Sequence, residues 1–179
     1  FTLSTFSNAN ASLISVDSSF GIDTITRDTS SGLEWLDPIE SLALTYNYVA
    51  GQFGSGQEFE GFRHATRSEV QTLFTNAGLN LFFGDPNNNY FGGVNQNAQP
   101  FIDLLNLLGG SLTTNPVPNP GARIHGFTST IITDGGSHSG LFAPVISIGQ
   151  SIDSPDLLGS ISATGLSSGQ YGSDVGHWL

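Results

Sequence analysis

The stretch GFRHATRSEVQTLF, residues 61–74, decides the fold by joining an expected short strand, residues 61–65, to an expected helix. Thr66 precedes Glu69 by three positions, which is the spacing of a capping box. Arg63 and its polar neighbours also raise the question of an active site, because the chain holds only 4 basic residues and 4 histidines. The helical pattern that follows favours a helix start over an active site.

Helical periodicity appears in three segments. After Thr66, apolar residues recur at three- and four-residue steps, and Gly78 is placed to end that helix. Residues 38–53 show the same period with Pro38 in the first turn, so we expect one amphipathic helix there, ended by Gly51 or Gly54. Residues 99–110 predict a third helix.

Strand patterns flank the helical segments on both sides. Residues 22–27 are rich in β-branched side chains, and residues 33–37 predict a short strand after a turn. Residues 84–97 are a loop by composition. The later strand patterns cover residues 122–133, 140–149, 157–166 and 171–179. Strands, then about three helices, then strands predict an α+β fold with a mostly antiparallel β-sheet.

Composition excludes several classes of function. The chain has 15 acidic and 4 basic residues, no lysine and a net charge of −11, so we expect no nucleic-acid partner. Cysteine is absent, which removes disulfides, thiolate metal sites and cysteine catalysis. No apolar run approaches the roughly 20 residues of a membrane span, so we expect no membrane insertion. Only 11% of residues are charged, and such a surface can associate without strong repulsion.

Two parts are expected along the chain. Residues 1–16 predict an N-terminal strand or arm without a charged residue, and residues 17–179 predict a single globular α+β domain. An extended arm of this kind can add to an open sheet edge of a second copy, with Phe1, Leu3 and Phe6 in pockets. Such a contact is head-to-tail and propagates as a filament unless it closes a ring. The alternative is an arm that pairs within its own domain.

Several stretches resemble the N-terminal half of secreted bacterial proteins that carry a PEP-CTERM sorting tail, which exosortases process. They are DTSSGLEWLD (28–37), LALTYNYV (42–49) and residues 61–74, and SDVGHWL (173–179) resembles the last strand of such domains. This resemblance implies export by a Gram-negative-type bacterium and a role at the cell surface or in the biofilm matrix. It implies no catalytic residues, and the Pro-Glu-Pro tail does not follow Leu179 in this sequence.

A more distant resemblance rests on the order of Trp35, Arg63, Thr66 and Glu69, which is similar to that in C-type-lectin-like domains. It implies that these four residues define the fold around the strand-to-helix junction. Catalytic members of the wider group use cysteines, and this chain has none, so their activity does not carry over.

The sequence offers one candidate site for a bound calcium ion and one for a covalent glycan. Oxygen ligands that calcium prefers gather at Asp85, Asn87 and Asn89, although Asp and Asn are also ordinary turn residues. Asn10 begins an N-x-S/T tripeptide and is a candidate for a covalent glycan.

Histidine, serine and tryptophan chemistry is less favoured. The histidines form no close pair in the sequence, so we expect His64 and His177 to be partly buried, hydrogen-bonded strand residues rather than zinc ligands. Residues 134–140 (DGGSHSG) hold the residue types of a Ser–His–Asp triad but lack its G-x-S-x-G elbow, so a hairpin loop is expected. Trp35 and Trp178 lie in apolar strands, where core packing is favoured over sugar stacking. The other histidines are His125 and His138.

Three classes of function remain, and we favour the first. It is a non-catalytic extracellular structural protein that binds copies of itself and forms filaments through the N-terminal strand. The second is a lectin-like module that binds carbohydrate or another ligand, with polysaccharide as the partner. The third is an enzyme, for which the sequence offers no positive support.

Overall fold

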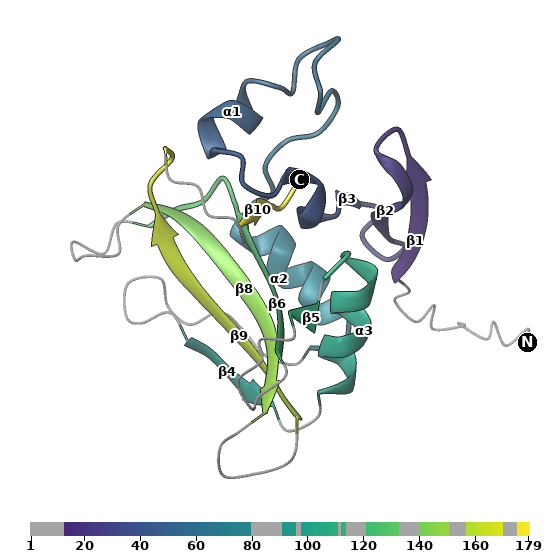
Figure 1. Cartoon of the computed structure of the whole chain (residues 1–179), viewed down its shortest axis with the longest axis vertical. Coiled ribbons are helices and arrows are strands. Elements are labelled where there is room, and N and C mark those ends of the chain that lie inside the picture. The colour runs from purple at the N-terminus through teal and green to yellow at the C-terminus, as the bar shows by residue number, and fades with distance from the viewer. Residues whose placement is uncertain are drawn as a thin grey trace, which may run out of the picture.

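The computed structural model describes most of the chain (Figure 1). The described residues are 13–79, 91–95, 98–110, 112–113, 121–132, 140–150, 157–169 and 175–179. They form two β-sheets with the two longer α-helices between them, which confirms the predicted α+β class with a mostly antiparallel sheet.

The small sheet has three antiparallel strands in sequence order. They are β1 (Leu13–Ser18), β2 (Gly21–Asp28) and β3 (Glu34–Leu36). The residues expected to end the arm, 13–16, belong to β1 and pair with β2 of the same chain, so the expected boundary after residue 16 falls inside a strand. The Asp28 side chain accepts hydrogen bonds from Ser30 N and Ser31 Oγ and so shapes the predicted turn between β2 and β3.

The large sheet has seven strands, with the order β10-β6-β8-β9-β4 along its main path. β5 pairs with β6, and β7 pairs with β8. All its described pairings are antiparallel except the short β10–β6 contact, which is parallel. The strands are β4 (Phe91–Asn95), β5 (Leu112–Thr113), β6 (Gly121–Phe127), β7 (Ile131–Ile132), β8 (Gly140–Gln150), β9 (Leu157–Leu166) and β10 (Gly176–His177).

The main core lies between the sheets and is built largely by two helices. Helix α2 (Arg67–Asn76) buries Val70, Leu73 and Phe74 completely, as its periodicity predicted. Helix α3 (Gln99–Leu107) buries Phe101, Leu104 and Leu105 in the same cluster, which also contains Ile146 of β8 and Trp35 of β3. The predicted start of α3 near Pro100 and the predicted end of α2 before Gly78 are confirmed. Gly78 has a φ of 83°, the left-handed conformation that glycine adopts readily.

The single helix predicted over residues 38–53 is wrong. The structure has a 3₁₀ helix η1 (Pro38–Ser41) and a separate helix α1 (Tyr46–Ala50). The break occurs where Ser41, the last residue of η1, and Ala43, between the two helices, bond to residues near the end of the chain. Ala43, at a φ of 60°, donates its N–H to the Val175 carbonyl, and Ser41 Oγ accepts from His177 N. The Thr45 hydroxyl then accepts from Tyr48 N and caps the new helix.

Two further predictions about local structure are corrected. Residues 61–65 form no strand, because Ala65 bonds to two different segments rather than along one ladder: its N–H donates to Trp178 O, and its carbonyl accepts from Ser129 N. Residues 91–95 of the predicted loop form β4, because β9 supplies hydrogen-bond partners that composition cannot reveal. Residues 84–90 and 96–97 of that loop lie outside the described part of the chain.

Candidate functional site

The strand-to-helix junction holds the predicted capping box. Glu69 N donates to Thr66 Oγ1 over 3.3 Å, and Thr66 N donates to Glu69 Oε2 over 2.8 Å. Each residue therefore satisfies a backbone amide that the first turn of α2 would otherwise leave unpaired. The structure confirms this role for the pair.

Arg63 completes the junction through an ion pair with Glu69. Its guanidinium donates to both carboxylate oxygens, with Nη1 3.0 Å from Oε2. The hydrogen bond from Arg63 and those from Thr66 lower the pKa of Glu69 to about 2, against the opposing effect of burial. The carboxylate of Glu69 is thus ionised and occupied, which suits a structural tie and does not suit a general acid or base near neutral pH.

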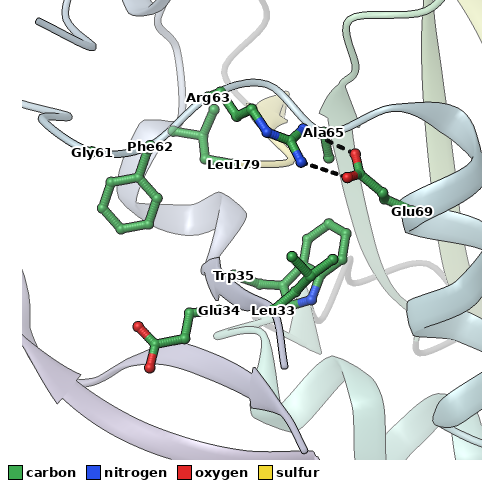
Figure 2. Close-up of a pocket in the computed structure, with 9 residues that line it drawn as sticks. All are labelled: Leu33, Glu34, Trp35, Gly61, Phe62, Arg63, Ala65, Glu69 and Leu179. Carbon is green, nitrogen blue, oxygen red and sulfur yellow. Dashed lines mark hydrogen bonds and ion pairs between the residues drawn. The ribbon is translucent and has the colours of Figure 1, made fainter. Parts of the chain in front are cut away.

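A pocket of about 150 Å³ opens beside this ion pair (Figure 2). Its wall is mostly apolar and its rim is charged. The lining residues come from β3 and the residue before it, from the irregular segment leading into α2, from α2 itself and from the last residue of the sequence: Leu33, Glu34, Trp35, Gly61, Phe62, Arg63, Ala65, Glu69 and Leu179. Of the four residues predicted to define the junction, only Thr66 is not among them.

Trp35 belongs to the wall of this pocket and to the protein core at once. Only 2% of it is exposed, and Trp178 is fully buried, so core packing is confirmed for both indoles. Nε1 of each indole is buried without a hydrogen-bond partner among the described residues. An unpaired buried N–H destabilises a fold by about 1–3 kcal/mol. Trp35 therefore lines the pocket, while its buried Nε1 has no partner in the described part of the chain.

His64 and His177, which are 113 positions apart in the chain, form a buried pair. His64 Nε2 lies 2.8 Å from His177 Nδ1, and His177 Nε2 lies 3.1 Å from the carbonyl oxygen of Leu44. Because a carbonyl only accepts, His177 carries its proton on Nε2, and His64 Nε2 must then donate to His177 Nδ1. The prediction that both residues are hydrogen-bonded is confirmed, but both are buried rather than partly buried. His177 lies in β10 as predicted, whereas His64 lies in the irregular segment before α2 and not in a strand.

Aromatic rings enclose the histidine pair. Tyr46 stacks on His64 with ring centroids 4.0 Å apart, and Phe127 lies 5.1 Å from His177. Burial lowers the pKa of His64 to about 3, assisted by repulsion from His177, and lowers that of His177 to about 4. Both rings are neutral near pH 7, and the pair joins α1, the segment before α2 and β10. The sequence offered no spacing signal for this pair.

The remaining candidate residues lie outside the described part of the chain. They are the arm residues Phe1, Leu3 and Phe6, the glycan candidate Asn10, the calcium candidates Asp85, Asn87 and Asn89, and His138. These remain predictions. Within the described ranges, no group of three or more His, Cys, Asp and Glu side chains is placed to hold a metal ion.

Comparisons with protein-family models, with curated proteins and with solved structures find no match. The resemblances to PEP-CTERM proteins and to C-type-lectin-like domains therefore remain predictions from the sequence. Among the described residues, no helix combines the length and the apolar character needed to cross a membrane.

Proposed function

We propose that this chain is a non-catalytic structural protein of the cell surface or biofilm matrix that assembles head-to-tail into filaments. The N-terminal arm of one copy inserts as a strand into the next copy. The observation that carries this proposal is the attachment of an uncharged, apolar-patterned arm to β1, an outer strand of the small sheet.

The position of β1 supports an arm that reaches beyond its own domain. Among the described strands β1 pairs only with β2, and the register of that pair runs from Leu13 opposite Asp28 to Ser18 opposite Gly21. The chain before Leu13 therefore enters the sheet at the end where β2 turns into β3. Twelve extended residues span up to about 40 Å, which is more than the thickness of a small domain.

Deletion of residues 1–8 tests the proposal. We expect the shortened chain to remain folded and to be monomeric, because the deletion removes the inserted strand and leaves β1 and both sheets intact. Sedimentation velocity and electron microscopy measure assembly, and circular dichroism with urea unfolding measures folding. A full-length variant with Phe1, Leu3 and Phe6 changed to Ser keeps the length of the arm but removes its apolar side chains, and it should also fail to assemble. Filaments that persist in the shortened chain contradict the proposal.

Carbohydrate binding is the second candidate function, and the pocket is the observation that favours it. Trp35 supplies an aromatic wall, and Glu34, Arg63 and Glu69 supply polar groups at the rim. The 2% exposure of Trp35 counts against a stacking platform, since a sugar needs an open ring face. A glycan array supports this candidate if clear binding is lost in Trp35→Ala while the variant remains folded.

A further inference from the structure

The outer edge of β3 offers backbone groups beside the pocket. Leu36 N donates to the Leu179 carbonyl and so points away from β2. The Leu33 carbonyl accepts from Asp28 N of β2 and so points toward β2. Since backbone groups alternate in direction along a strand, the N–H and C=O of Glu34 also point away from β2. Within the described ranges, no residue bonds to these two groups. β3 therefore presents a short open edge at Glu34, next to Trp35 and beside the pocket.

From this juxtaposition we infer that the β3 edge and the pocket together form the acceptor for the N-terminal arm of a second copy. Backbone groups of the arm bond to Glu34, and the side chain of Phe6 fills the pocket. This inference rests on the proposed function and names the surface that receives the inserted strand. Strand addition of this kind takes affinity from the backbone and specificity from a side-chain pocket.

The size and chemistry of the pocket suit a phenyl ring. Its volume is about 150 Å³, and an engineered apolar cavity of roughly 150 Å³ in another protein binds benzene. Leu33, Trp35, Phe62, Ala65 and Leu179 supply an apolar wall. The charged rim residues already have partners, because Arg63 binds Glu69 and Glu34 binds Arg27. An uncharged arm can therefore enter without leaving a rim charge unpaired.

The direction of β1 favours a second copy over the arm of the same chain. Ile14 lies opposite Arg27, and Arg27 lies opposite Glu34, so the arm starts two strands from the acceptor edge, about 10 Å away. The axis of β1, continued beyond Leu13, runs past the β2–β3 turn and away from the small sheet. The arm's own acceptor requires a reversal around that turn, whereas the acceptor of a neighbouring copy does not.

Paired cysteines test the contact directly, because the natural chain contains none. If Phe6 faces the pocket with Trp35, then Ser7 shares the opposite face with Glu34. Full-length Ser7→Cys and full-length Glu34→Cys are mixed and oxidised, and we expect a disulfide that joins the two variants, detected by mass spectrometry. Ile131→Cys, an exposed position on β7, replaces Glu34→Cys as the control acceptor and should not join.

A second measurement uses the side chain that fills the pocket. Phe6→Ala should weaken assembly about 100-fold, as expected for a buried aromatic anchor. Thr5→Ala, on the opposite face of the same arm, should change assembly by less than about twofold.

The outcomes separate this inference from the proposed function. If residues 1–8 are needed for assembly but the Ser7–Glu34 disulfide does not form between copies, the acceptor lies elsewhere and the filament proposal stands. A disulfide that forms only within one chain of the Ser7→Cys/Glu34→Cys double variant also overturns the inference. If assembly does not need residues 1–8, the proposed function fails and the inference fails with it.

Discussion

Burial has opposite effects on the acids and bases inside this protein. It lowers the pKa of His64 to about 3 and the pKa values of His125 and His177 to about 4, because a charged imidazole loses hydration in the interior. Burial is also the main reason that the pKa of Asp37 rises to about 7, despite a hydrogen bond from Thr26. Burial favours the neutral form of all four residues. Acidification therefore lowers the stability contributed by the histidines and raises that contributed by Asp37.

Stability should fall on mild acidification. Between pH 6.5 and about 4 the unfolded chain binds more protons at the three histidines than the folded chain does. The contribution of the histidines to the free energy of unfolding therefore decreases as the pH is lowered. Asp37 opposes this, since between pH 3.8 and about 7 the folded chain binds more protons at its carboxyl. Three groups outweigh one, so we expect a lower urea midpoint at pH 5 than at pH 7.5.

Two variants separate these contributions. His64→Gln can keep a donor toward His177 without titrating, so the drop in midpoint should shrink. Asp37→Asn removes the opposing carboxyl, so the drop should become steeper. A midpoint that stays constant or rises between pH 7.5 and 5 in the natural chain contradicts the assignment.

At the level of elements, glycines allow close approach at two contacts of the core. A Cβ at Gly159 of β9 would overlap the ring of Phe101 on α3, and a Cβ at Gly176 of β10 would overlap the Pro38 carbonyl. The first contact sets how closely α3 lies against the large sheet. The second joins β10 to η1, next to the point where the predicted long helix breaks.

Gly159→Ala should therefore destabilise the protein strongly. The added methyl group must displace Phe101, which is fully buried, and overpacking of this kind costs about 1–3 kcal/mol or more. Gly169→Ala is the matched control, because a Cβ at Gly169 has open space around it. Urea unfolding of both variants measures the difference. Equal stabilities would show that α3 and β9 can separate at little cost.

At the level of the whole molecule, assembly must overcome like charge. Only 11% of residues are charged, so the repulsion is not strong, but the net charge of −11 still makes copies that meet end to end repel one another. The proposed contact is apolar and backbone-mediated, so it gains nothing from opposite charges and is opposed by the overall field.

Salt should consequently strengthen the filament. Raising NaCl from 0.02 to 0.5 M shortens the screening length from about 20 Å to about 4 Å, and we expect assembly to tighten by about tenfold. Analytical ultracentrifugation across the salt series measures the change. The chain without residues 1–8 should stay monomeric throughout, which separates screening from salting out. Weaker assembly at high salt would instead indicate that ion pairs hold the copies together.

The local features of this protein follow from the sequence. The capping box of Thr66 and Glu69, the buried face of α2 and the start of α3 near Pro100 are all confirmed, and so are most of the strand patterns. Each depends on residues only a few positions apart, so their spacing carries the information. The predicted junction residues Trp35, Arg63 and Glu69 do come together, although the sequence did not predict the pocket that they line.

Tertiary structure alone decided the rest. The break between η1 and α1 depends on two hydrogen bonds with residues near the end of the chain: Ser41 Oγ accepts from His177 N, and Ala43 N donates to the Val175 carbonyl. β4 exists because β9 lies beside it. The His64–His177 pair and the pocket join segments more than 100 positions apart. The spacing of residues along a sequence records only neighbours within a turn or a strand, so contacts of this range are settled by how the two sheets and their helices pack.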